Sequence, residues 1–240
     1  MPKKQKVILF GYGSFGRHLY KYLRQSGHQV KVVSRSEENI KIGEQDIIDI
    51  RYINFKKNEE FLSLGINPQH DLLYCAMSRT ANNLFLVLTL RTLYPKAKII
   101  AISNSSENAR KMKYAGADSV IDLYEATARR VTHNLTKPAV TKAIDEIIYH
   151  KSNIKMAEIE IPEKTFLDGK HLNEIDFKSM GLVLIAVIDR EFGNEALIAD
   201  KRIDHKLDGG DILVLVGKES DIGMFKEKIK GTGDLSGAAL

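Results

Sequence analysis

Apolar and polar residues alternate along the first half of the chain with two different periodicities. Short runs of β-branched and other apolar residues are separated by longer stretches whose apolar positions recur at helical spacing. This order of strands and helices is typical of a parallel sheet with helices on both faces, and it predicts a Rossmann-like domain over residues 1–123. The candidate strands are Val7–Phe10, Val30–Val33, Ile47–Ile50, Leu72–Ala76, Ile99–Ile102 and Ser119–Ile121.

The second half of the chain has a different pattern. A helical pattern over residues 124–152 contains Pro138, which predicts two helices joined by a kink. Residues 153–230 mix alternating and continuous apolar runs with a last helical pattern, and they predict a small α+β domain. Residues 231–240 are small, and they predict a flexible tail. The expected fold class is therefore α/β with a helical crossover and a small α+β C-terminal domain, and no internal repeat is evident.

A glycine-rich turn follows the first predicted strand. Gly11, Gly13 and Gly16 stand between this strand and an amphipathic helical pattern, which is the context that gives the G-x-G-x-x-G spacing its meaning. Gly11 can take the tight bend, Gly13 lets a pyrophosphate approach the backbone, and Gly16 lets the helix sit close to the sheet. Since a helix N-terminus also offers unpaired N–H groups, the turn predicts a nucleotide site.

Composition and charge narrow the class of protein. No apolar run reaches the roughly 18 residues that span a bilayer, and no secretory segment begins the chain, so we expect a cytoplasmic protein. The net charge is +5, but the lysines are scattered and no nucleic-acid-binding motif accompanies them, so no nucleic-acid partner is expected. The single cysteine, Cys75, lies in an apolar run and predicts a buried structural thiol.

Several segments together resemble the RCK family, also called TrkA or KTN, over about residues 5–230. They are "VILFGYGSFG", "VKVVSRSEEN", Asn83 before Leu84, "GADSVI" at 116–121, "GKHL" at 169–172 and "GGDILVLVG" at 209–217. The resemblance implies a nucleotide-binding TrkA-N half at 1–123, crossover helices for dimerisation at 124–152 and a ligand-binding TrkA-C half at 153–230.

The resemblance also implies a function. Members regulate potassium channels or transporters from the cytosolic face of the membrane. They assemble as homodimers, commonly in octameric rings, and convert ligand binding into movement of a gate in an integral-membrane pore. The implied cofactor is an adenine nucleotide or NAD(P)(H).

The chain departs from the family pattern around the predicted nucleotide site. Ser34 and Arg35 stand where the family has an acidic residue after its second strand, and Asn54 stands where another acid follows the third. A serine beside a fixed cation tolerates a phosphorylated ribose better than it selects plain NAD. Ser14 replaces a frequent basic residue between the glycines, so an empty pocket remains an alternative.

Other candidate residues have both a functional and a structural interpretation. Arg35 can hold a phosphate or lie in solvent, and Asn83 can cap a helix or face the ligand. Glu158, Glu160 and Glu163 suit a divalent cation, yet alternating Glu also fits an ordinary half-exposed strand. His171 and His205 have no evident partner, and the turn around Gly209 explains Asp208 and Asp211. The predicted cofactor-binding residues are Gly11, Gly13, Ser14, Phe15, Gly16, Ser34, Arg35, Asn54, Ala76, Met77, Asn83, Ser103 and Asn104.

Three functions are therefore compared. The first is a ligand-responsive regulator of potassium flux, and it is favoured because the small C-terminal half shows no placed acid or base for catalysis. The second is a small NAD(P)-dependent oxidoreductase. The third is a structural domain with an empty glycine turn.

Overall fold

The computed structural model describes residues 5–149, 153–189, 196–198 and 205–230. The tail predicted over residues 231–240 lies outside these ranges. The chain divides into two compact units, Met1–His133 and Asn134–Leu240. Among the described residues, no helix combines the length and the apolar character needed to cross a bilayer.

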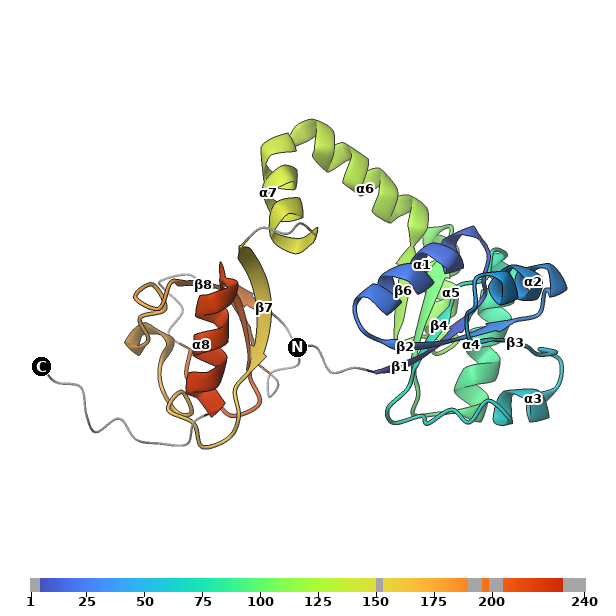
Figure 1. Cartoon of the computed structure of the whole chain (residues 1–240), viewed down its shortest axis with the longest axis horizontal. Helices are drawn as coiled ribbons and strands as arrows, with labels where there is room; N and C mark the ends of the chain where they lie inside the picture. Colours follow the sequence, from blue (N-terminus) through green and yellow to red (C-terminus); the bar gives the residue numbers. More distant parts are fainter. Residues whose placement is uncertain (1–4, 150–152, 190–195, 199–204, 231–240) are drawn as a thin grey trace, which may run out of the picture. The chain divides into compact units, whose positions relative to one another are not determined.

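The described part of the first unit contains a parallel six-stranded sheet in the order β3-β2-β1-β4-β5-β6 (Figure 1). This order reverses direction between β1 and β4, which is where open α/β sheets bind ligands beyond the carboxyl ends of their strands. The strands are β1 (Lys6–Phe10), β2 (Gln29–Ser34), β3 (Ile50–Tyr52), β4 (Leu72–Cys75), β5 (Lys98–Ser103) and β6 (Ser119–Asp122).

Helices cover both faces of this sheet because its central strands are apolar on both sides. Ile8 and Phe10 of β1 pack among residues of α3, α4 and α5, whereas Val7 and Leu9 pack with residues of α1 and α2. Cys75 is fully buried, which confirms the structural thiol, and burial raises its pKa. The helices are α1 (Ser14–Gln25), α2 (Glu37–Gln45), α3 (Asn58–Leu62), α4 (Thr80–Leu93) and α5 (Ser106–Tyr114).

The prediction of a strand over Ile47–Ile50 is wrong. Ile47 has a φ of 53° and is 93% exposed, because the chain here makes the turn that ends α2. The backbone N–H of Ile48 donates to the carbonyl of Gly43 (3.1 Å), and β3 begins only at Ile50. Ile48 and Ile50 are partly buried and pack against the core, whereas Ile47 is exposed, so the apolar pattern here does not correspond to a strand.

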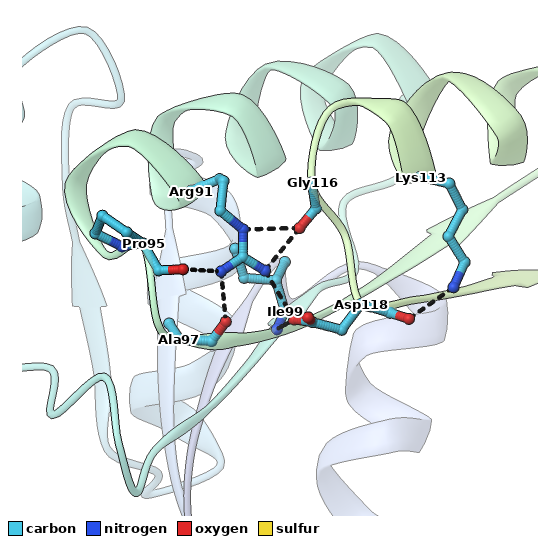
Figure 2. A network of polar contacts seen from close by, with 7 residues as sticks. All are labelled: Arg91, Pro95, Ala97, Ile99, Lys113, Gly116 and Asp118. Carbon is cyan, nitrogen blue, oxygen red and sulfur yellow. Dashed lines mark hydrogen bonds and ion pairs between the residues drawn. The ribbon is translucent and has the colours of Figure 1, made fainter. Parts of the chain in front are cut away.

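One arginine ties together the amino ends of β5 and β6. Arg91, in the last turn of α4, donates through Nη1 to the carbonyls of Pro95 (2.6 Å) and Ala97 (2.9 Å). It also donates to the carbonyl of Gly116 through Nε (2.9 Å) and Nη2 (2.7 Å), and Nη2 pairs with Asp118 Oδ2 (2.8 Å; Figure 2). The "GADSVI" segment therefore has a structural role at the edge opposite the predicted ligand site.

The predicted break at Pro138 is confirmed. Helix α6 (Leu123–Thr136) ends two residues before it, and Pro138 is the first residue of α7 (Pro138–Tyr149). Proline suits this position because the first helical N–H has no intrahelical partner.

The second unit contains, in its described part, an antiparallel four-stranded sheet in the order β7-β10-β8-β9. Helix α8 packs on this sheet through Ile222, Phe225 and Ile229, and Phe225 meets Phe177 edge to face at 5.9 Å. The predicted fold class, a Rossmann-like sheet followed by a small α+β domain, is confirmed. The elements are β7 (Ile154–Glu160), a 3-10 turn (Leu172–Glu174), β8 (Leu182–Ile188), β9 (Ala196–Ile198), β10 (Ile212–Lys218) and α8 (Glu219–Lys230).

Candidate functional site

Two of the three glycines in the β1–α1 turn are required by packing. Gly11 has a φ of +113°, and a Cβ there would lie 2.6 Å from the carbonyl oxygen of Ala76 at the end of β4. A Cβ on Gly16 would overlap the carbonyl oxygen of Gly11. These two glycines therefore hold α1 close to the sheet, as the motif predicts.

Gly13 differs because no backbone atom lies against the place of a Cβ. Its φ is −74°, and a Cβ there would meet only the hydroxyl of Ser78, at 2.7 Å, which is the end of a mobile side chain. Gly13 is the N-cap of α1, no side chain caps this helix, and its first turn contains no acidic residue. The N–H groups at the start of α1 thus keep their capacity to bind an anion.

Tyr12 fixes the backbone between these glycines. Its hydroxyl donates to Asp46 Oδ2 (3.1 Å), and its ring packs edge to face on Tyr20 at 5.9 Å. Burial, with the Asp46 carboxylate beside it, raises the pKa of Tyr12 to about 12. The turn is therefore held rigidly by a neutral phenol.

Cavities lie on both sides of the glycine turn, and both are lined by Met77 and Ser78. Their volumes, about 520 and 310 Å³, fall in the range of small-molecule sites. The larger is lined by Gly11, Tyr12, Gly13, Ser34, Arg35, Ser36, Glu38, Asn39, Met77, Ser78, Arg79 and Asn82. The smaller is lined by Ser14, Phe15, Ala76, Met77, Ser78, Thr80, Asn83, Ile102, Ser103, Asn104, Leu123 and Tyr124.

The ends of β2 and β5 repeat one local structure. Ser34 Oγ accepts from the N–H of Ser36 (3.1 Å), and Ser103 Oγ accepts from the N–H of Ser105 (3.2 Å). Ser36 and Ser105 then cap α2 and α5. The similar sequences "SRSEEN" (34–39) and "SNSSEN" (103–108) form these two turns. Both strand-end hydroxyls are buried and used in turns.

Asn83 has a role that neither sequence interpretation anticipated. It does not cap α4, whose N-cap is Arg79. Its Oδ1 accepts from the N–H of Met77 (2.8 Å), and its Nδ2 donates to the carbonyls of Met77 (3.0 Å) and Ile102 (3.1 Å). The buried amide therefore joins the carboxyl ends of β4 and β5, and Asn83 also lines the smaller cavity.

Two arginines line the larger cavity. The side chains of Arg35, after β2, and Arg79, after β4, are exposed and make no hydrogen bond or ion pair within the described residues. Glu38, in the first turn of α2, is the acid of this cavity. Sequence reasoning missed Arg79 and Glu38, since Arg79 lies four positions beyond the end of β4 and Glu38 lies inside α2. Arg17, by contrast, is exposed and outside both cavities.

Asn54 lies apart from the glycine turn. Its N–H donates to Glu60 Oε2 (2.6 Å), and its Oδ1 accepts from the N–H of Lys56 (3.0 Å). It lines a separate cavity of about 300 Å³ with Arg35, Tyr52, Phe55 and Lys56. Only Arg35 connects this cavity with the larger one.

In the second unit, the side chains that lie close together are not the ones that the sequence indicated. Glu158 and Glu160 are exposed on β7, as an ordinary edge strand would place them. His205, expected to have no partner, instead lies between Asp211 Oδ2 (3.3 Å) and Asp189 Oδ2 (3.7 Å). These three are the ligand-type side chains that lie close together within the described residues. Asp211 also accepts from the N–H of Asp208 (3.0 Å), which confirms the predicted turn.

Comparison with known proteins covers both units. The chain matches the TrkA-N domain over residues 7–123 and the TrkA-C domain over residues 156–230. A probable potassium channel protein 2 of Methanocaldococcus jannaschii is 22% identical over 234 residues, which cover 95% of this chain and 67% of that protein. Potassium channel protein 1 of the same organism is 19% identical over 225 residues, 93% of this chain and 66% of that protein. The chain thus spans about two-thirds of these relatives.

The fold of the first unit also occurs in a solved structure. The NAD(P)-binding domain of an exopolyphosphatase-related protein from Archaeoglobus fulgidus superposes with a TM-score of 0.50 at 19% identity. The match covers 56% of this chain and 99% of that one. The two domain matches follow each other in the order that the sequence predicted, and the chain belongs to the RCK family, with a TrkA-N domain followed by a TrkA-C domain.

Proposed function

We propose that this chain is a ligand-sensing regulatory part of a potassium channel or transporter and that it binds an adenine nucleotide or NAD(P)(H). The observation that carries the proposal is the uncapped start of α1 at Gly13, at the point where the strand order reverses, with a cavity on each side. This arrangement suits a pyrophosphate at the helix N-terminus with its two substituents on opposite sides.

The positions of the two cavities indicate which half of the ligand each would hold. The larger cavity lies toward β2, where Rossmann-like sites hold the adenosine half, and the smaller lies toward β5. Ser14, Phe15 and Asn104 line the smaller cavity, and they would contact the second half of a dinucleotide or a water-filled space beside a mononucleotide. Asn83 and Ser103 line the same cavity and also hold the backbone of this edge in place.

The regulatory role follows from the family and its relatives. The two M. jannaschii relatives are potassium channel proteins, and this chain matches about two-thirds of each. The pore would be supplied by an integral-membrane partner or by a further part of the same protein. Regulation then requires that ligand binding favour one arrangement of subunits over another.

The helices α6 and α7 provide a surface for subunit contact. Val131, Leu135, Val140, Ile144 and Ile148 are all more than 40% exposed. Exposed apolar residues in such number on consecutive helices indicate an interaction surface. We therefore assign this surface to a homodimer, from which an octameric ring can be assembled, at the cytosolic face of the membrane.

Ligand release tests the nucleotide proposal directly. The purified chain is denatured, and the released small molecules are identified by ultraviolet absorbance and mass spectrometry. The refolded or ligand-free chain is then heated with ADP, ATP, NAD⁺ or NADH, and at least one should raise its Tm. Absence of both a released nucleotide and any rise in Tm would contradict the proposal, and steady oxidation of NAD(P)H with a substrate would favour the oxidoreductase instead.

A further inference from the structure

The end of β2 carries a cation where NAD sites carry an acid. Resting on the nucleotide site proposed above, we propose that the preferred ligand bears a phosphate on its adenosine ribose, as NADP(H) does. Arg35 and Arg79 would hold this phosphate.

The first step of the argument is the lack of an acceptor for an unmodified ribose at the end of β2. A carboxylate about 20 residues after the glycine turn accepts the ribose hydroxyls in NAD sites, and Ser34 occupies this place. Ser34 is only 2% exposed, and its hydroxyl oxygen accepts a hydrogen bond from the N–H of Ser36. Ser36 Oγ in turn accepts from the N–H of Asn39 (3.4 Å). The strand end therefore leaves no side-chain oxygen free for the ribose diol.

The second step is the position of the two guanidinium groups. Strands β2 and β4 flank β1, so Arg35 and Arg79 follow strands on either side of the glycine turn. Both line the same cavity, and neither side chain has a partner within the described residues. A guanidinium binds phosphate oxygens through two parallel N–H groups, which makes arginine well suited to a phosphate monoester.

The third step is charge. The pyrophosphate of ADP or NAD is accommodated at the start of α1, which leaves both arginines without an anion. A ribose phosphate adds a charge of about −1.5 to −2 near pH 7 and thus matches the two cations. Glu38 works against this match, because its carboxylate lines the same cavity and could accept the hydroxyls of an unphosphorylated ribose. Recognition by Glu38 is therefore the competing outcome.

The test compares ligands that differ only in this phosphate. NADPH and NADH are titrated into the full chain by fluorescence, and adenosine 2′,5′-bisphosphate and AMP by calorimetry. We expect the phosphorylated member of each pair to bind at least about 10-fold tighter, the low end for a charge-assisted hydrogen bond. Arg35→Ala should weaken NADPH by about 10- to 100-fold and Arg79→Ala by about 10-fold, while NADH changes little.

Two further variants make the result specific. Arg17→Ala removes an exposed cation outside the cavity, so it should affect NADPH and NADH alike. Glu38→Gln should leave NADPH binding intact or strengthen it. Circular dichroism confirms that each variant is folded.

Each contrary outcome has a distinct meaning. Equal affinity for both members of a pair, or equal losses in Arg35→Ala, would overturn the ribose-phosphate inference and leave the nucleotide site standing. Tighter binding of NADH that is lost in Glu38→Gln would overturn it in favour of Glu38. If none of the four ligands binds and ADP, ATP and NAD⁺ also fail, the proposed function falls with it.

Discussion

Single residues in the glycine turn divide into those that shape the backbone and the one that admits the ligand. Gly11 and Gly16 have no room for a Cβ because backbone carbonyls occupy its place. Gly13 lines the larger cavity, and a methyl group there would require only the Ser78 hydroxyl to rotate away. A substitution at Gly13 therefore separates ligand binding from folding.

Gly13→Asp should abolish nucleotide binding while the fold persists. The carboxylate would stand at the N-terminus of α1 and occupy the place of the ligand phosphate. Gly13→Ala is the matched control, since it adds bulk without charge and should retain binding with reduced affinity. Thermal shifts with ADP and NADH measure both variants, and unchanged stabilisation of Gly13→Asp by nucleotide would remove the turn from the site.

Asn83→Leu should lower the free energy of unfolding by about 2–4 kcal/mol, because the Met77 N–H and the carbonyls of Met77 and Ile102 would lose their partner in a buried place. Asn82→Ala, at the partly exposed neighbouring position, should change it by less than about 0.5 kcal/mol. Urea unfolding provides the measurement. Equal losses in the two variants would mean that the buried amide does not join β4 to β5 as described.

Among the secondary-structure elements, the carboxyl ends and the amino ends of the strands of the first sheet have different roles. The carboxyl ends of β1, β2, β4 and β5 carry the candidate site, whereas the amino ends of β5 and β6 are held by Arg91. The arginine uses its planar group to reach several carbonyls and one carboxylate at once (Figure 2). A flexible lysine cannot reproduce this arrangement.

Arg91→Lys should destabilise the first unit by about 1.5–3 kcal/mol, since most of the bonds to carbonyl groups would be lost while the charge stays. Arg110→Lys on exposed α5 is the control and should be near neutral. Chemical denaturation compares the two. Nucleotide affinity should stay unchanged in Arg91→Lys, because the network lies at the edge opposite the site, and a selective loss of affinity would contradict this separation.

At the scale of the whole molecule, the proposed regulatory role requires contact between subunits. The exposed apolar residues of α6 and α7 offer the surface on which a second copy can pack, and a two-fold arrangement would pair the same patch on both chains. Ligand binding at the first sheet could then change the angle between subunits.

The double variant Ile144→Asp/Ile148→Asp should convert a dimer into a monomer at micromolar concentration. Two charges would be placed on an apolar surface that must lose its water on association. Ile47→Asp is the control, because Ile47 is 93% exposed on the turn after α2 and belongs to neither helix, so the change should leave the dimer intact. Light scattering gives the mass of each protein. A monomeric wild type, or a dimer that survives the double change, would contradict the assignment.

Features that depend on neighbouring residues were predictable from the sequence alone. Alternation of apolar runs predicted five of the six strands of the first sheet within one or two residues, and glycine and proline marked the α1 turn and the break before α7. These signals are local because backbone sterics and side-chain periodicity act over a few residues. The prediction for Ile47–Ile50 failed for the same reason, since a short apolar run does not distinguish a strand from a turn whose side chains pack only in part on the core.

Which distant residues share a site depends on the packing of the whole fold and was not predictable from the sequence. The strand order β3-β2-β1-β4-β5-β6 brings Arg79 to the cavity that contains Gly13 and Arg35, although 44 positions separate the two arginines in the chain. In the same way, pairing of β8 with β10 allows Asp189 and Asp211 to meet His205. The physical reason is that hydrogen bonding between strands and the packing of two apolar faces join segments with no relation in sequence, and no local pattern encodes which ends will meet.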